Sequence, residues 1–276
     1  YGSLDYSVNA TSTTFAKHGM AKNQNRMSVS GKFQIGNFDI GLTSFGSGAI
    51  QIDGQNATGV SVVPSADVKL NTQALMARYS FNDKYSIIGG VRRAKLKAST
   101  LNTVAPADYS IGAIDKSGMV YGLAYERPDI ALKFEVLRSE KITIGLTGNV
   151  IYSGSTLPVT GTLVIPEATS INFQTGIAEN TLLMASAHKV NWTGSDIGLN
   201  VSLAPPLNQA SDFSNTTSYS LGLGRRLNKA TSASLTYAWE KGTNPGGAST
   251  SPFTMSNGSQ TLSAGVKHKI GSITIS

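Results

Sequence analysis

Alternation of residues on both sides of a two-residue turn is the feature that most constrains this chain. In "YSFNDKYSIIGG" (79–90), Tyr79 and Phe81 share one parity before an Asn-Asp pair, and Tyr85 and Ile87 share one parity after it. This pattern predicts two antiparallel strands joined by a tight turn. The other parity carries serine, and arginine flanks the stretch at both ends. The apolar face of this hairpin could therefore lie on the outside of the sheet.

The composition favours a membrane barrel over a soluble β protein. Charged residues make up only 14% of the 276 residues, whereas soluble domains average roughly 25%. The hydrophobic fraction is nevertheless only 40%, and Gly, Ser, Thr and Asn make up the difference. This balance is expected when one face of each strand meets lipid and the other meets water. The chain contains no Cys, which excludes a disulfide framework and a thiolate metal site.

The longest uncharged stretch, Ile142 to Pro166, is long enough to raise the question of a membrane helix. Glycines and Pro158 interrupt it, and Thr, Val and Ile dominate the remainder. A spanning helix needs about 20 mostly apolar residues. The stretch therefore predicts two strands on either side of "YSGSTLP" (152–158).

Short turns alternate with longer polar links along the whole chain. The short turns are "QIGN" (34–37), "FNDK" (81–84), "ERPD" (126–129), "IAEN" (177–180), "RLNK" (226–229) and "KIGS" (269–272). The long links are 13–25, 46–67, 98–116, 153–159, 193–214 and 243–257. Short turns at one end and long loops at the other are typical of outer-membrane barrels. Counting in this way gives twelve complete strands and a thirteenth that begins near Ser272.

The two faces of the predicted strands differ in polarity. In "DIALKFEVLR" (129–138), apolar residues such as Phe134 occupy one parity, while Lys133 and Glu135 occupy the other. A soluble core would not accept these two charges without close pairing, whereas a wet lumen would. We therefore expect an all-β, antiparallel transmembrane β-barrel that forms a single domain over residues 1–276. A two-layer soluble β protein with its polar face in solvent is the alternative.

Several segments resemble the FadL/TodX outer-membrane transporters of long-chain fatty acids and other hydrophobic compounds. They are "ALMARYSFNDKYSIIGGVR" (74–92), "YERPDIALKFEVLRS" (125–139), "INFQTGIAENTLLMASAHKVNW" (171–192) and "SYSLGLGRRLNKATSASLTYAWEKG" (218–242). The resemblance covers most of the chain in matching order. It implies a monomeric fourteen-stranded barrel, an N-terminal hatch inside it, and passage of an apolar ligand through a side opening in the wall.

The chain departs from that family pattern at its start, because residue 1 falls where the first strand is expected. We therefore expect the hatch and the last strands to lie outside this chain. No ligand-binding residues are carried over from the family, since much of its gating machinery belongs to the hatch.

Catalysis, metals, cofactors and nucleic acids find no support in the sequence. His18, His188 and His268 are scattered without metal-ligand spacing. No Gly-x-Ser-x-Gly motif is present, and "GLGRR" (222–226) lacks most of a dinucleotide fingerprint. The formal net charge is +7, but the densest basic run, "RRAKLK" (92–97), contains no aromatic residue for stacking on bases.

That basic run suggests contact with the membrane surface. If Val91 faces lipid, then Arg93, Lys95 and Lys97 follow on the same parity toward the loop end of the strand. There they would meet the phosphates of the outer leaflet and its lipopolysaccharide. A solvated strand end is an equally good interpretation. Leu96, on the opposite parity, indicates that a bulge could intervene.

The sequence thus predicts a channel of the bacterial outer membrane that admits hydrophobic small molecules such as long-chain fatty acids. Arg78, Lys133 and Glu135 fall on the inward parity, and the two cations could replace the hydration of a carboxylate ligand. Alternatively, they pair with luminal acids such as Glu126. A general diffusion porin and a soluble or surface β adhesin are the competing functions.

Overall fold

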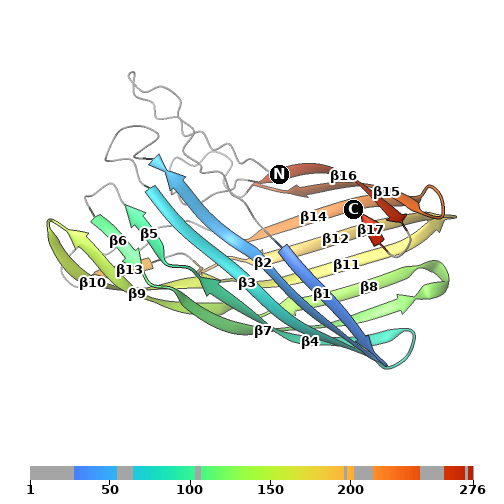
Figure 1. Ribbon diagram of the computed structural model, residues 1–276, viewed down its shortest axis with the longest axis horizontal. Coiled ribbons are helices and arrows are strands. Elements are labelled where there is room, and N and C mark those ends of the chain that lie inside the picture. Colours follow the sequence, from blue (N-terminus) through green and yellow to red (C-terminus); the bar gives the residue numbers. More distant parts are fainter. Residues whose placement is uncertain are drawn as a thin grey trace, which may run out of the picture.

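The computed structural model describes residues 28–54, 65–102, 107–195, 198–201, 214–242, 258–270 and 273–275. The strands are β1 (Ser28–Ile35), β2 (Phe38–Asp53), β3 (Ser65–Ser80), β4 (Tyr85–Leu96), β5 (Ser99–Asn102), β6 (Ala107–Ile111), β7 (Ile114–Arg127), β8 (Leu132–Ser139), β9 (Ile142–Tyr152), β10 (Ser155–Ile165), β11 (Glu167–Ala178), β12 (Thr181–Asn191), β13 (Gly198–Val201), β14 (Thr216–Arg226), β15 (Thr231–Glu240), β16 (Ser259–Ile270) and β17 (Ile273–Ile275), with a 3-10 turn η1 (Pro128–Ile130). All seventeen strands belong to one sheet (Figure 1), and every pairing in it is antiparallel. In these ranges no helix is both long and apolar enough to cross a bilayer.

Several strand segments are halves of longer strands. Ile165 of β10 pairs with Ile142 of β9, and three residues further along both strands Ala168 of β11 pairs with Ser139 of β8. The register therefore continues across the break. Junctions at 97–98, 112–113, 140–141 and 166, together with the stretch between Asn191 and Gly198, reduce the seventeen segments to twelve strands in the described part of the chain. The register shifts by one residue at 97–98 relative to β3 and by two residues between Asn191 and Gly198 relative to β10 and β11. Each long strand pairs with the next one along the chain, which confirms the predicted antiparallel β class.

The twelve long strands correspond to the second through thirteenth strands expected from the sequence. The first expected strand falls on residues 1–27, which lie outside the described ranges. Within the described residues, β1 pairs only with β2 and β17 pairs only with β16. The structure thus shows a continuous wall of strands, and fourteen strands in a closed ring stays a prediction.

The short turns lie where the sequence predicts them, and two of them use the same asparagine device. Asn82 Oδ1 accepts hydrogen bonds from the backbone N–H groups of Lys84 and Tyr85, at 2.9 Å each. Asn228 Oδ1 accepts equivalent bonds from Ala230 and Thr231, at 2.9 and 2.8 Å. Such side-chain turns replace the bonds that the backbone lacks where the chain reverses. In the last predicted turn, residues 271–272 lie outside the described ranges.

The predicted long links were wrong in extent, because the strands continue into them. β2 runs to Asp53 and β3 begins at Ser65, while β5 and β6 occupy much of 98–116. The link at 153–159 is only a two-residue turn at Ser153 and Gly154, whose φ angles are +49° and +79°. Link 193–214 contains β13, and links 13–25 and 243–257 lie outside the described ranges.

The part of the wall between the short turns and the junctions, which we call the lower wall, has an exposed apolar face. Paired positions on neighbouring strands form a row across it: Phe38, Tyr79, Ile87, Leu123, Val136, Ile171, Ala187, Tyr219 and Trp239. Leu123 is 64% exposed in this row. Aromatic residues cluster near the short turns, where the Tyr85 and Tyr125 rings lie 5.1 Å apart. The apolar face is the one that the sequence assigned to the outside of the wall.

The opposite face is polar and concave. Arg78 of β3 forms an ion pair with Glu126 of β7 at 2.8 Å, although β4 lies between those two strands. Convergence of side chains over an intervening strand is favoured on the inner side of a curved sheet, where side chains on one face approach one another. Serine pairs line the same face, with Ser186 Oγ and Ser220 Oγ at 2.7 Å. We refer to this side as the inner face.

Beyond the junctions the polarity of the wall reverses. On β4 the outward parity carries Val91, but past the junction the same parity carries the buried Leu101 of β5. The change occurs because Lys97 and Ala98 are both exposed, so one alternation is skipped. The outer face then becomes polar, as at Thr100 and its partner Ser110. A sheet with polar outer positions and apolar inner positions is suited to water outside it.

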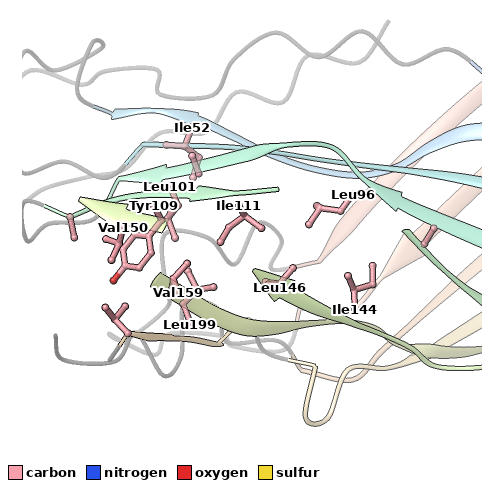
Figure 2. Packing of buried hydrophobic residues seen from close by; sticks show 14 of the residues in the cluster. Ile52, Leu96, Leu101, Tyr109, Ile111, Ile144, Leu146, Val150, Val159 and Leu199 are labelled. Atoms are coloured by element: carbon pink, nitrogen blue, oxygen red, sulfur yellow. The ribbon is translucent and has the colours of Figure 1, made fainter. Parts of the chain in front are cut away.

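The reversed part of the sheet encloses a packed apolar core. We call the segments β5, β6, β9, β10 and β13 the extension, and they lie together at one end of the molecule (Figure 1). Figure 2 shows the side chains of Tyr109, Val150, Val159 and Leu199 gathered between these strands, with Ile52 from β2 beside them. Ile144 is 0% exposed in this core.

Candidate ligand path

A charge cluster lies on the inner face of the wall, near the short turns. It begins with Lys32 and Asp39, whose Nζ and Oδ2 atoms are 3.1 Å apart. Asp39 is the cross-strand partner of Arg78, and Arg78 continues the chain of charges to Glu126. Opposite charges at such separations stabilise one another more strongly on a partly buried face than in open water.

The other half of the cluster surrounds Lys133. Its Nζ lies 3.6 Å from Glu126 Oε1 and 3.6 Å from Glu135 Oε2. Glu135 Oε1 also accepts a hydrogen bond from Asn172 Nδ2 at 3.2 Å. The cluster balances three cations (Lys32, Arg78 and Lys133) against three carboxylates (Asp39, Glu126 and Glu135).

The structure therefore brings together the three inward residues that the sequence singled out: Arg78, Lys133 and Glu135. Both cations have carboxylate partners, as in the ion-pair alternative considered from the sequence. Arg78 nevertheless has a buried Nε–H with no hydrogen-bond partner, and Asp39 has a buried Oδ1 with none. Buried polar groups without partners are uncommon in proteins, and the Nε–H of Arg78 is a buried donor that the ion pair with Glu126 does not use.

Farther along the inner face, one stretch of the wall lacks strand pairing. Val120 of β7 pairs with Ser139 of β8, and Ile111 of β6 pairs with Gly148 of β9. Between these points residues 113–118 and 141–146, all of which are described, have no paired partners across the interface. The pairing is interrupted over this stretch because the junctions at 112–113 and 140–141 are staggered along the two strands. We call this interrupted stretch the seam.

Arg92 bridges the seam from the inside. Its Nη2 donates to the carbonyl oxygen of Glu140 at 2.6 Å and to that of Pro166 at 3.2 Å. Both carbonyls belong to junctions, where the strand ladder is broken. Arg92 reaches them across β7, where its cross-strand partner is Gly118. The sequence analysis did not identify Arg92 as a site residue, although the parity of Leu96 and the position of Pro166 were signals of the break.

Ile142 fills the space beneath the seam. A Cβ atom placed on Gly118 would lie 2.7 Å from Ile142 Cγ1, so the glycine is needed for this packing. Ile142 is only 2% exposed. At the lower end of the seam, the Glu140 N–H donates to the Met119 carbonyl at 2.9 Å, and the Met119 N–H donates to Glu140 Oε2 at 3.2 Å.

The basic residues predicted at the membrane surface lie on the outer face beyond Val91. Arg93 forms an ion pair with Asp115. Lys95 and Lys97 are exposed, and neither forms an ion pair with another described residue. Inside the extension, burial raises the pKa of Tyr109 above its ordinary value.

These features define a class of protein: an antiparallel wall with an apolar outer face, a charged inner face and a packed extension beyond it. Solved structures with a similar fold include a FadL homologue and toluene transporters. A FadL homologue of Pseudomonas aeruginosa matches with a TM-score of 0.72 at 14% identity over 90% of this chain and 66% of that chain. This chain thus spans just under two thirds of that protein's length.

Two toluene transporters have the same fold. TbuX of Ralstonia pickettii matches with a TM-score of 0.66 at 14% identity, over 94% of this chain and 77% of that chain. TodX of Pseudomonas putida matches with a TM-score of 0.57 at 13% identity, over 88% and 73%. No protein-family model and no curated protein sequence matches the chain. The fold of the FadL/TodX family, expected from the sequence, is confirmed. These neighbours are transport channels, not enzymes.

Proposed function

We propose that this chain forms the wall of an outer-membrane channel that admits hydrophobic small molecules. The observation that carries the proposal is the reversal of polarity along single strands. The lower wall exposes an apolar face such as lipid requires, and the extension exposes a polar face such as water requires. A protein wholly in water would gain nothing from the first face. The similarity in fold to toluene transporters and to a FadL homologue supports the same function.

The neutral charge balance of the inner cluster argues against a general diffusion porin. A porin that selects hydrophilic ions uses a constriction with rings of like charge. Here the cations and carboxylates compensate one another across β1, β2, β3, β7 and β8. The other end of the described wall carries a cluster of packed apolar side chains on its inner side. Such an interior favours an uncharged or weakly charged apolar solute.

For the chemical class of the ligand we propose compounds that include long-chain fatty acids. Arg78 supports this proposal, because its Nε–H is buried without a partner and its side chain is 17% exposed. A guanidinium can bind a carboxylate through two parallel hydrogen bonds. Lys133 adds a second positive charge beside Glu126, the carboxylate that Arg78 also contacts. Because ion pairs also explain this cluster, comparison of charged and uncharged ligands is the informative test.

For the outer surface we propose that Arg93, Lys95 and Lys97 contact the phosphates of lipopolysaccharide. They follow directly after the apolar outer positions of β4, where a membrane interface would fall. Basic side chains just outside the hydrocarbon attract anionic headgroups. The localisation proposed here is the bacterial outer membrane, with the protein acting as a monomer.

The proposal is tested by purification and reconstitution. The protein should require detergent, show strand circular dichroism and migrate differently before and after heating in electrophoresis. In liposomes it should accelerate entry of a fluorescent fatty acid and of an uncharged apolar dye, without releasing trapped hydrophilic dye. Stable monodisperse protein in plain buffer would favour the adhesin alternative. Release of the hydrophilic dye at the rate of apolar entry would favour the porin alternative.

A further inference from the structure

We propose that Arg92 is a positioning residue that keeps the wall closed at the seam, and that losing its two hydrogen bonds separates β7 from β9. The inference goes beyond the proposed function because it concerns how the wall is held shut, whichever compound it admits. It uses that function only in placing the wall in a membrane.

The seam leaves backbone carbonyl groups without partners in the strand ladder. Strand pairing normally satisfies the backbone carbonyls of every interior strand. At the junctions, the Glu140 and Pro166 carbonyls have turned away from the ladder, and one guanidinium nitrogen binds both. Bonds from a charged donor are stronger than those between neutral groups. Arg92 therefore replaces ladder bonds with a contact that a single side-chain rotation can break.

Arg92 joins long strands that are not neighbours. It lies on β4, Glu140 lies at the β8–β9 junction, and Pro166 lies at the β10–β11 junction. The β6–β7 strand, with Gly118 opposite Arg92, runs between them. A tie of this kind sets the curvature of the wall at one level. Without it, the unpaired stretch would depend on the packing of Ile142 against Gly118 and on the hydrogen bonds at its two ends, between Glu140 and Met119 and between Gly112 and Thr147.

The seam separates two well-paired regions. Below it, Val120 to Arg127 pair with Leu132 to Ser139. Above it, Ala107 to Ile111 pair with Gly148 to Tyr152. Opening would therefore be local, with the core around Val150 and the lower wall unchanged.

The chain supplies its own clean background for the test, because it contains no cysteine. We would place single reporters at Ile142→Cys, which is buried at the seam, and at Val150→Cys, which is buried in the extension core. Each would be combined with Arg92→Met, which keeps the length of the side chain but removes its donors. The matched control is Arg225→Met, which removes the same charge from an exposed position on β14, away from the seam. The readout is the rate of labelling by a maleimide in folded, detergent-solubilised protein.

With Arg92→Met we expect the Ile142→Cys reporter to react at least about tenfold faster than in the parent, since a lost charged hydrogen-bond pair is worth more than 1.4 kcal/mol. Val150→Cys should stay slow, and Arg225→Met should change neither rate. An unchanged Ile142→Cys rate would overturn the proposal. Equal acceleration at Ile142→Cys and Val150→Cys would also overturn it, because Arg92 would then stabilise the whole extension.

If Arg92→Met does not yield heat-modifiable protein, Arg92→Lys takes its place. A lysine ammonium on that stem can bind one carbonyl but lacks the planar fork that serves two. Acceleration at Ile142→Cys alone would again support the proposal, and no acceleration would overturn it. Labelling does not depend on any transported compound, so this result is independent of whether the proposed channel function is correct.

Discussion

Arg92 and Gly118 are direct cross-strand partners, and the arginine reaches beyond β7 across the glycine. Any side chain on Gly118 would occupy the space that Ile142 now fills, since an added Cβ would lie 2.7 Å from Ile142 Cγ1. The pair thus joins a long polar side chain to the one residue type that leaves room for the packing beneath it.

From this relationship we expect Gly118→Val to loosen the seam even though valine favours strands. Labelling of Ile142→Cys cannot be used here, so the readout is proteolysis of folded protein between residues 113 and 118. Cleavage there should increase. The matched control is Gly145→Val, because an added Cβ on Gly145 meets nothing within 4 Å. Equal cleavage in both variants would show that the effect does not come from displacing Ile142.

A second prediction tests the reversal of polarity along the strands. Leu123→Arg puts a charge on the apolar outer face and should destabilise the protein in bilayers by about 2–4 kcal/mol, the cost near a bilayer midplane. Thr147→Arg puts the same charge on the outer face of β9 and should cost less than about 0.5 kcal/mol, as for most surface substitutions. Both are measured by urea unfolding in liposomes. Similar losses for the two variants would contradict the placement of the membrane.

A third prediction concerns the charge cluster. Arg78→Ala and Lys133→Ala should leave a heat-modifiable protein but slow the entry of a fatty acid more than that of an uncharged apolar compound. The reason is that only the carboxylate needs a cation to replace its lost hydration. Arg78→Lys is the conservative comparison, since it keeps the charge without the planar fork. Equal loss for both compounds, or loss for neither, would leave the cluster with a purely structural role.

A fourth prediction addresses the extension core. Ile144→Ala removes a side chain that is 0% exposed, and substitutions of this kind typically cost 2–5 kcal/mol. Ile151→Ala removes a similar side chain from the exposed face of the same strand, β9, where Ile151 is 51% exposed. This substitution should cost far less. Limited proteolysis at the Ser153–Gly154 turn provides the measurement. The first variant should be cut faster than the parent, and the second should be cut at the parent's rate.

Much of the fold was predictable because the lower wall follows one rule from strand to strand. Alternation at Tyr121 and Leu123 gave the correct outer face, and Asn82 marked its turn through a known side-chain device. Lys133 and Glu135 were placed correctly on the inner face for the same reason.

The extension was harder to predict because its alternation runs in the opposite sense. Thr156 and Thr160 on β10 look like loop residues when apolar side chains are expected outside, yet they form the polar outer face. The predicted link at 153–159 was too long for that reason, although it contains the observed turn at Ser153 and Gly154. Arg92 could not be recognised as a bridging residue, because its partners are carbonyls of Glu140 and Pro166, far away in the sequence. Every residue has a backbone carbonyl, so a hydrogen bond to one leaves no signal in the sequence.

The uninterrupted register of the β8–β9 and β10–β11 hairpin has a consequence for the height of the molecule. From Leu132 to Tyr152 the strand has 21 residues, or roughly 70 Å of extended chain at about 3.3 Å per residue. Tilted by about 45°, it would rise roughly 50 Å, about twice the apolar band of about 25 Å that transmembrane β-barrels have. Half of the hairpin would then project beyond the membrane into the sugar layer outside the cell. There its threonine-rich outer face would contact solutes before they reach the membrane.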